Sequence, residues 1–174
     1  KLKYGGSIFF GHRRIGRNGL PFNCMKFRTM VPDAEERLEM ILNADSKLRR
    51  QWQHDRKLDP DPRIIPGIGV FLRNSSLDEL PQLWNILVGD MSFVGPRPVT
   101  EDELPNYGNY VGHYLAVRPG LTGPWQIGGR SDVSYSDRVL ADVQYVENAS
   151  VATDFWIFAK TIFYFVTGRL MGGR

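Results

Sequence analysis

The stretch from Leu72 to Asn85 constrains the fold most, because it combines a helical apolar period with two adjacent carboxylates and a proline. Ser76 and Glu79 have the spacing of a capping box, so we expect a helix to begin at Ser76. Pro81 cannot donate a backbone hydrogen bond and argues against a smooth helix. The period itself predicts one buried helical face, made of apolar residues at steps of three and four: Leu77, Leu80, Leu83, Trp84 and Leu87.

The capping box would place Asp78 and Glu79 in the first helical turn, where free backbone N–H groups and the helix dipole favour negative charge. Both carboxylates are then expected to stay ionised, which suits a nucleophile or a metal ligand better than a proton donor. The simpler interpretation is that Glu79 caps the helix and Asp78 lies on its surface without chemistry. The rest of the chain has to decide between the two.

Charge is distributed unevenly along the chain. The net charge is only +3, but residues 1–30 contain no Asp or Glu. Such a cluster suggests a phosphate-bearing partner, such as a nucleotide, a lipid head group or nucleic acid, and a solvated basic face is the plain alternative. Its members are Lys1, Lys3, Arg13, Arg14, Arg17, Lys26 and Arg28.

The length of 174 residues predicts one domain with a genuine core. The single cysteine, Cys24, can form no internal disulfide and fits a reducing compartment. No run of about 18 apolar residues and no signal peptide is visible. The chain opens at Lys1 without a methionine, so we expect residues 1–174 to be a C-terminal fragment of a longer membrane protein.

Local patterns predict an α+β fold that is mostly helical, with a short N-terminal β-hairpin and interfacial amphipathic helices. The hairpin spans residues 7–27, with its turn at Asn18 and Gly19. A second capping box at Asp33 opens one long surface helix to about Lys57. Further along, we expect a short strand or loop at residues 63–71. A polar helix or loop is expected at residues 101–115, and a helix at residues 136–147.

Two segments rich in proline or glycine carry further arginines. Pro96 and Pro98 fix the backbone on either side of Arg97, which would present its guanidinium in one defined place. The plain alternative is a rigid loop with a solvent-facing arginine. Arg118 and Arg130 bracket the richest glycine segment, whose glycines would allow the backbone to approach a ligand closely. That segment lacks the spacing of a Walker loop or a dinucleotide fingerprint.

The apolar tail at residues 154–167 is too short to span a bilayer and has Lys160 in its middle. Aromatic residues with flanking basic residues fit a helix that lies in the membrane interface, and a buried core helix is the competing interpretation. The histidines, His12, His54 and His113, have no metal-ligand spacing, and we interpret them as structural.

Five segments together, in this order, resemble the bacterial sugar transferase family, the monotopic polyprenyl-phosphate phosphoglycosyl transferases. They are KFRTM at 26–30, DPRI at 61–64, SLDELPQLWN at 76–85, GPRP at 95–98 and RPGLTG at 118–123. The resemblance runs from about Gly6 to the C-terminus. It implies transfer of a sugar 1-phosphate from a UDP-sugar to undecaprenyl phosphate, with release of UMP, on the cytoplasmic face of the inner membrane. Such a step initiates assembly of an exopolysaccharide, a capsule, a lipopolysaccharide O-antigen or a glycoprotein glycan.

The resemblance also implies roles for individual residues. In the family, the aspartate of an Asp-Glu dyad attacks the phosphate next to the sugar and forms a covalent intermediate, which makes the route ping-pong. Asp78 matches that aspartate, and the family's required Mg²⁺ makes Asp78 the first candidate as its protein ligand. Glu79 matches the partner glutamate, which is expected either to assist proton handling or to position phosphate and metal. Asp142 is a weaker candidate for the rim of the site. Cationic side chains would neutralise the phosphates, with Arg73 and Arg97 favoured; the full set is Lys26, Arg28, Arg73, Arg97, Arg118 and Arg130.

Family members carry a membrane-embedded helical hairpin before the segment that begins at Gly6, and this chain starts after it. The resemblance therefore implies inner-membrane lipid as a partner, no nucleic acid, and a catalytic domain over residues 1–174. The identity of the sugar, the glycan pathway and a homodimer stay open.

Two rival interpretations remain. The first is a peripheral lipid- or nucleic-acid-binding module without catalysis, which predicts strong salt dependence, indifference to Mg²⁺ and no effect of Asp78→Asn. The second is a degenerate family member retained as a scaffold, although the dyad and the arginines are all present.

Overall fold

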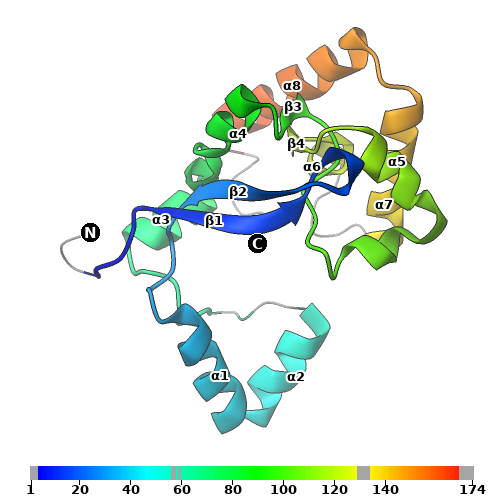
Figure 1. Cartoon of the computed structure of the whole chain (residues 1–174). Helices are drawn as coiled ribbons and strands as arrows, with labels where there is room; N and C mark the ends of the chain where they lie inside the picture. Colours follow the sequence, from blue (N-terminus) through cyan, green and yellow to red (C-terminus); the bar gives the residue numbers. More distant parts are fainter. Residues whose placement is uncertain (1–3, 56–57, 59, 129–133, 169–174) are drawn as a thin grey trace.

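A two-stranded antiparallel hairpin crosses the centre of the computed structural model (Figure 1). Strand β1 (Phe9–Ile15) pairs with β2 (Pro21–Phe27), with Phe9 opposite Phe27 at one end. They are joined by a 3-10 turn, η1 (Arg17–Gly19), in which Asn18 has a left-handed φ of 60°, a conformation that asparagine tolerates well. The structure describes residues 4–55, 58, 60–128 and 134–168. The predicted hairpin and turn are confirmed.

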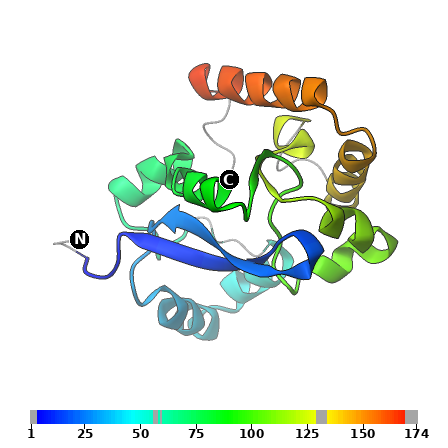
Figure 2. The same cartoon turned by 45° about the horizontal axis from the view of Figure 1, so that its top comes forward.

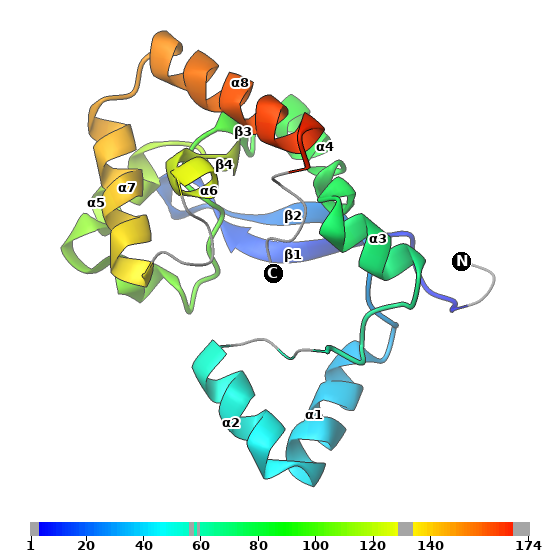
Figure 3. The ribbon, with the colours of Figure 1, turned by 180° about the vertical axis from the view of Figure 1, so that it is seen from behind.

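The predicted long helix is two helices, α1 (Ala34–Ala44) and α2 (Ser46–Asp55), which lie apart from the other helices in Figures 1 and 3. The break is at Asp45, whose backbone is extended and whose carboxylate accepts hydrogen bonds from Lys47 N at 2.7 Å and Leu48 N at 3.2 Å. Asp45 therefore caps α2 and ends α1. Asp33 makes no capping bond and instead pairs with Arg37 at 2.8 Å, so that capping box is wrong.

The stretch around the dyad is also not one helix. It contains α3 (Ile68–Asn74), a 3-10 turn η2 (Leu77–Glu79) and α4 (Gln82–Val88). The capping box at Ser76 is wrong, because Ser76 has a left-handed φ of 57° and caps nothing. Pro81 stands at the start of α4, as expected for a residue that cannot continue a helix. In the segment at residues 63–71, expected as a short strand or loop, Ile64 forms an isolated bridge with Met30. The expectation is wrong for residues 68–71, because α3 begins at Ile68.

The apolar period in this stretch predicted the wrong buried face. Trp84 and Leu87 are 62% and 79% exposed, whereas Gln82 and Asn85 are 3% and 2% exposed. The apolar side of α4 therefore faces outward, and its polar side faces the hairpin.

Two further short strands, β3 (Ser92–Val94) and β4 (Gly120–Thr122), pair in parallel. A Cβ atom on Gly120 would overlap the backbone nitrogen of Gly95, and one on Gly95 would lie 2.6 Å from Arg118 O. These two glycines allow two chain segments to pack closely. For Gly120, the sequence suggested an approach to a ligand instead. The pairing holds Arg97 and Arg118 on adjoining segments.

The remaining helices pack around two small apolar cores. η3 (Leu104–Tyr110), α5 (Val111–Ala116) and α7 (Tyr135–Glu147) enclose one core with the end of β1. Its buried members are Ile15, Val99, Tyr107, Tyr114, Val139 and Val143. α6 (Pro124–Gly128), α7 and α8 (Val151–Val166) meet at the other core, which contains Val94, Ile127, Tyr145 and Ile157. The expected helix at 136–147 and the mostly helical α+β fold are confirmed.

Helix α8 lies on the outside of the molecule (Figure 2). Ile157 is buried, and Thr161 Oγ1 lies 2.8 Å from Thr122 Oγ1, but Phe155 and Trp156 are 72% and 57% exposed. A buried core helix is therefore wrong for this segment. Within the described ranges, no helix combines the length and apolar character needed to cross a bilayer.

Candidate active site

The dyad is presented by η2 next to strand β2. Asn85 on α4 fixes this arrangement because its Oδ1 accepts from Met25 N at 2.9 Å and its Nδ2 donates to Asn23 O at 2.9 Å. The side-chain amide of Asn85 thus satisfies backbone groups of β2 that a neighbouring strand would otherwise pair with. Its Nδ2 also donates to Asp90 at 3.1 Å. These contacts hold α4, and the dyad that precedes it, against the hairpin.

Glu79 forms an ion pair with Lys26 across this contact. Lys26 Nζ donates to Glu79 Oε1 at 2.6 Å, and both side chains are about a quarter to a third exposed. Burial alone would raise the pKa of Glu79, but the charges of Lys26 and Arg97 and the hydrogen bond from Lys26 outweigh it and hold the pKa below its usual value. Glu79 is therefore ionised, as the sequence predicted.

Asp78 lies deeper, with 9% of its surface exposed. Burial raises its pKa, and the charge of Glu79 adds to the increase, while Lys26 and Arg73 counteract it. Asp78 and Glu79 lie in the first turn of η2, as expected, but η2 is a 3-10 turn rather than the start of a long helix. That Asp78 stays ionised remains a prediction. A carboxylate with little solvent around it is a stronger nucleophile once ionised.

Arg73 is held beside Asp78 by a hydrogen bond from its Nε to Thr29 Oγ1 at 2.9 Å. Its charge lowers the pKa of Asp78. It also interacts with Asp61, which is paired with Arg63 through two hydrogen bonds of 2.7 and 2.8 Å. The Arg73 guanidinium is thereby placed to neutralise negative charge near Asp78.

Arg97 is exposed between two buried prolines, Pro96 and Pro98. That its guanidinium is held in one defined place stays a prediction. Its guanidinium lies 5.7 Å from the ring centre of Trp125. Its charge lowers the pKa of Glu79, so Arg97 lies within electrostatic reach of the dyad.

The other predicted cations are less closely tied to the dyad. Arg28 N donates to Ile8 O at 2.8 Å, and its side-chain Nε is buried without a hydrogen bond in the described part of the chain. The Arg118 guanidinium lies against Gly89, at the far end of α4 from the dyad. Seven helical residues separate the two ends by about 10 Å. Arg130 lies outside the described residues.

Asp142 is not at the rim of the site. It is 2% exposed within the core, and its Oδ2 accepts from Tyr107 OH at 2.8 Å. Burial raises its pKa to about 7, although the bond from Tyr107 acts in the opposite direction. Asp142 therefore has a structural position between α7 and η3.

Among the described residues, no group of three or more His, Cys, Asp or Glu side chains gathers in a metal-binding arrangement. Mg²⁺ is nevertheless commonly held by one or two carboxylates together with water and substrate phosphates. Asp78, next to Glu79, offers such a donor set. The residues present therefore fit Mg²⁺ bound jointly with a phosphate substrate better than a metal bound by protein alone.

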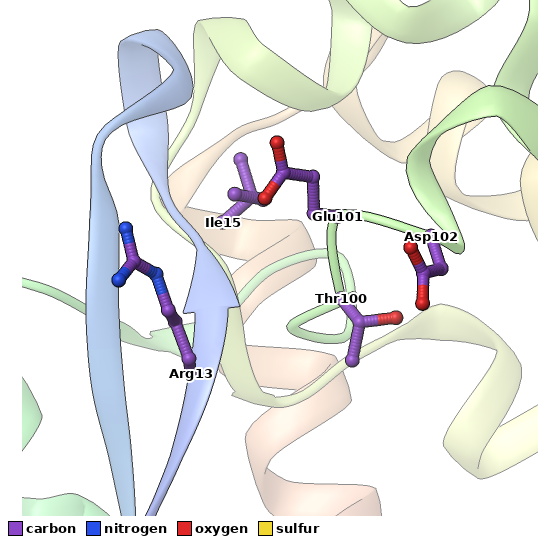
Figure 4. A pocket seen from close by; sticks show the side chains of 5 residues that line it. All are labelled: Arg13, Ile15, Thr100, Glu101 and Asp102. Atoms are coloured by element: carbon purple, nitrogen blue, oxygen red, sulfur yellow. The ribbon is translucent and has the colours of Figure 1, made fainter.

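A separate hollow of about 210 Å³ lies at the end of the hairpin. Figure 4 shows Arg13 and Ile15 from β1, and acidic side chains from the segment after β3, around it. Its lining is Arg13, Ile15, Thr100, Glu101 and Asp102. None of the predicted site residues lines it, so we place the candidate site at the dyad.

Sequence reasoning missed several residues that shape the site. Asn85 and Thr29 act through contacts with residues 60 and 44 positions away, which no local pattern reveals. Arg14 was noted only as part of the basic cluster, yet its charge lowers the pKa of Glu79. Arg14 shares a face with Lys26 in the observed register, in which Arg14 is opposite Phe22 and Phe10 is opposite Lys26, and that register could not be read from the sequence.

Comparison with known proteins gives consistent matches. A family model described as bacterial sugar transferase matches residues 1–168. The exopolysaccharide production protein ExoY of Rhizobium meliloti is 54% identical over 162 residues, which cover 93% of this chain and 71% of that protein.

Two longer relatives are similar over the same region. The UDP-galactose-lipid carrier transferase of Erwinia amylovora is 52% identical over 158 residues, or 91% of this chain and 33% of that protein. The undecaprenyl-phosphate galactose phosphotransferase of Salmonella typhimurium is 50% identical over 157 residues, or 90% of this chain and 33% of that protein. The chain thus spans about a third of the length of these two relatives.

Proposed function

The chain belongs to the bacterial sugar transferase family, and from that premise we propose that it transfers a sugar 1-phosphate from a UDP-sugar to undecaprenyl phosphate and releases UMP. The observation that carries the proposal is the position of Asp78, a nearly buried carboxylate beside Glu79 whose pKa responds to the charges of Lys26 and Arg73. The names of the Erwinia and Salmonella relatives, which mention UDP-galactose and undecaprenyl phosphate, support the same substrates.

The proposed reaction has two steps. A carboxylate oxygen of Asp78 bonds to the phosphorus next to the sugar, and the bond from that phosphorus to the bridging oxygen breaks, so that UMP leaves with the electron pair. A phosphate oxygen of undecaprenyl phosphate then bonds to the same phosphorus, and the phosphorus–Asp78 bond breaks. The product is a lipid diphosphate sugar, and the Asp78 carboxylate is regenerated.

The residues around the dyad have complementary roles in this proposal. A carboxylate that attacks a diphosphate meets like charge, so Arg73 and Arg97 would bind and neutralise the phosphate oxygens. Lys26 keeps Glu79 ionised and oriented. Asp78 and Glu79 would hold Mg²⁺, which when bound supplies positive charge to the diphosphate. Arg28, Arg118 and Arg130 remain candidates for other phosphate contacts.

The exposed apolar surface supports association with a membrane. α3, α4 and α8 follow one another along one edge of the molecule (Figures 1 and 3). They expose apolar side chains that a soluble surface rarely carries together; among them are Ile68, Phe71, Trp84, Leu87, Phe155, Trp156 and Phe163. We propose that this edge lies in the interface of the inner membrane, with the dyad facing the cytoplasm, where a lipid phosphate is within reach.

Single-turnover release of UMP tests the proposal. With Mg²⁺ and a UDP-sugar but no lipid acceptor, the two-step route predicts a burst of one UMP per active site, which Asp78→Asn abolishes. Asp102→Asn, at an exposed carboxylate lining the separate hollow, is the matched control and should keep the burst. If no burst occurs but UMP is released once undecaprenyl phosphate is added, transfer is direct and the covalent step is wrong. No release under either condition would favour the binding-module alternative.

A further inference from the structure

His12 and Arg14 lie on the same face of the hairpin as Lys26. Side chains alternate between the two faces of a strand. In the register of β1 with β2, Phe10 is opposite Lys26 and His12 is opposite Cys24. The face that presents Lys26 to the dyad therefore continues through His12 to Arg14, toward the turn of the hairpin.

The charges that act on the dyad also act on His12. Burial lowers the pKa of the His12 ring, and the nearby charges of Arg14, Lys26 and Arg97 lower it further. All three cations also act on Glu79. His12 is therefore a neutral ring at pH 7, within electrostatic reach of the same cations that act on Glu79.

An ion pair fixes the orientation of this ring. Arg14 Nη1 donates to Glu103 Oε2 at 2.9 Å, and Arg14 Nη2 lies 3.1 Å from His12 Nδ1. A guanidinium only donates, so Nδ1 accepts and the ring proton is on Nε2. Thr100 N also donates to Glu103 Oε2 at 2.8 Å, which holds the carboxylate in place.

The result is a matched donor and acceptor at the edge of the candidate active site. His12 is exposed and offers an N–H group, and the Glu103 side chain is 44% exposed and offers a carboxylate. A sugar hydroxyl both donates and accepts, so a pair of this kind suits a hexose. The polar edge of uracil has a carbonyl oxygen on each side of its N–H group, and a carboxylate would repel both.

We propose that His12 and Glu103 bind hydroxyl groups of the donor's hexose and so select the sugar, with Arg14 as their positioning residue. The proposal rests on the proposed function, because it takes the donor to be a UDP-sugar. It assigns sugar selection to the hairpin face and to the residue that precedes η3, rather than to the phosphate-binding arginines.

Binding measurements test this assignment separately from turnover. In the full chain with Asp78→Asn, which prevents the covalent step, dissociation constants are measured by calorimetry for UDP, UDP-galactose and UDP-glucose. The more tightly bound of the two UDP-sugars is used for comparison. The readout is the dissociation constant of that UDP-sugar divided by the dissociation constant of UDP. His12→Leu and Glu103→Gln should each raise this ratio about tenfold, the usual effect of a lost hydrogen bond of this strength. His12→Gln, which keeps a donor, should change it less than about threefold.

Arg13→Leu is the matched control. Arg13 is adjacent in sequence but lies on the opposite face of β1, in the hollow that Figure 4 shows. It should leave the ratio unchanged. Equal weakening of UDP and UDP-sugar by His12→Leu, or an unchanged ratio in both test variants, would overturn the assignment.

The two proposals fail in different ways. If the ratio shifts as expected but the chain with Asp78 intact releases no UMP, the sugar site stands and the transferase function does not. If UMP is released and the ratio does not move, the transferase stands and the sugar site is wrong. Failure to bind any UDP-sugar would overturn both.

Discussion

Lys26 and Glu79, 53 positions apart in the chain, form an ion pair of 2.6 Å between the hairpin and the turn that carries the dyad. The contact joins the basic N-terminal cluster to the acidic motif, the two features that stand out in the sequence. It also explains why the pKa values of the two carboxylates of the dyad shift in opposite directions. Glu79 is stabilised as an anion by Lys26 and Arg97, whereas burial of Asp78 favours its neutral form.

The first prediction concerns this ion pair. Lys26→Met removes both the charge and the hydrogen bond that lower the pKa of Glu79, so Glu79 becomes protonated at a higher pH. The burst rate of UMP release at pH 7 should fall about tenfold or more. The acid limb of its pH–rate profile should move to higher pH, because ionised Glu79 is lost earlier as the pH falls. Lys47→Met, on exposed α2, is the control; an acid limb that stays in place would show that Lys26 does not tune Glu79.

The second prediction concerns Asn85. Asn85→Ala leaves Met25 N and Asn23 O without their partners at a site that is 2% exposed. The free energy of unfolding, measured with urea, should fall by about 2–3 kcal/mol. The exposed Asn43→Ala should change it by less than about 0.5 kcal/mol. Equal losses in the two variants would mean that the amide does not hold α4 against β2.

The third prediction concerns the pH dependence of stability. The folded pKa of Asp142 is raised to about 7, above that of an unfolded aspartate. Between about pH 4 and pH 7 the unfolded chain loses this proton and the folded chain keeps it, so stability falls as the pH rises, by at most about 1.4 kcal/mol per pH unit. Asp142→Asn keeps an acceptor for Tyr107 and should flatten this decline in urea unfolding.

Asp102→Asn, at an exposed carboxylate, serves as the control for that experiment and should leave the slope unchanged. An Asp142→Asn variant with the same slope as the parent chain would show that Asp142 does not hold its proton in the folded state.

The fourth prediction tests the membrane-facing edge. Leu87 is 79% exposed on α4, so Leu87→Asp should leave the melting temperature nearly unchanged. Partitioning onto phospholipid vesicles should fall about tenfold or more, because burying a leucine contributes about 1.5–3 kcal/mol. Met40→Asp changes an equally apolar side chain, 62% exposed, on α1 away from that edge. If both variants lose vesicle binding equally, the α3–α4–α8 edge is not the contact surface.

Local sequence patterns predicted the elements that local interactions determine. The hairpin follows from β-prone runs on either side of Asn18 and Gly19. α7 starts close to the expected residue 136 and is capped locally, where Ser134 Oγ accepts from Asp137 N. The exposed position of Arg97 follows from its flanking prolines. In these cases the residues that decide the structure are close together in the chain.

The rest of the site depends on contacts between distant segments. The period in α4 predicted a buried apolar face, but the polar face is buried, because Asn85 bonds to a strand 60 residues earlier. The Ser76 capping box failed because the chain turns there with a left-handed backbone. Asp142 was placed at the site by its residue type alone, and only its bond to Tyr107 reveals a core position.

The most direct test of the central claim is the mass of the protein itself. The chain is mixed with Mg²⁺ and a UDP-sugar without lipid acceptor, quenched in acid within one turnover, and analysed intact and as peptides by mass spectrometry. The account predicts an added mass of one sugar phosphate, located on the peptide that contains Asp78 and absent from Asp78→Asn. UMP release without any adduct, or an adduct on a different residue, would contradict the claim that Asp78 is the nucleophile.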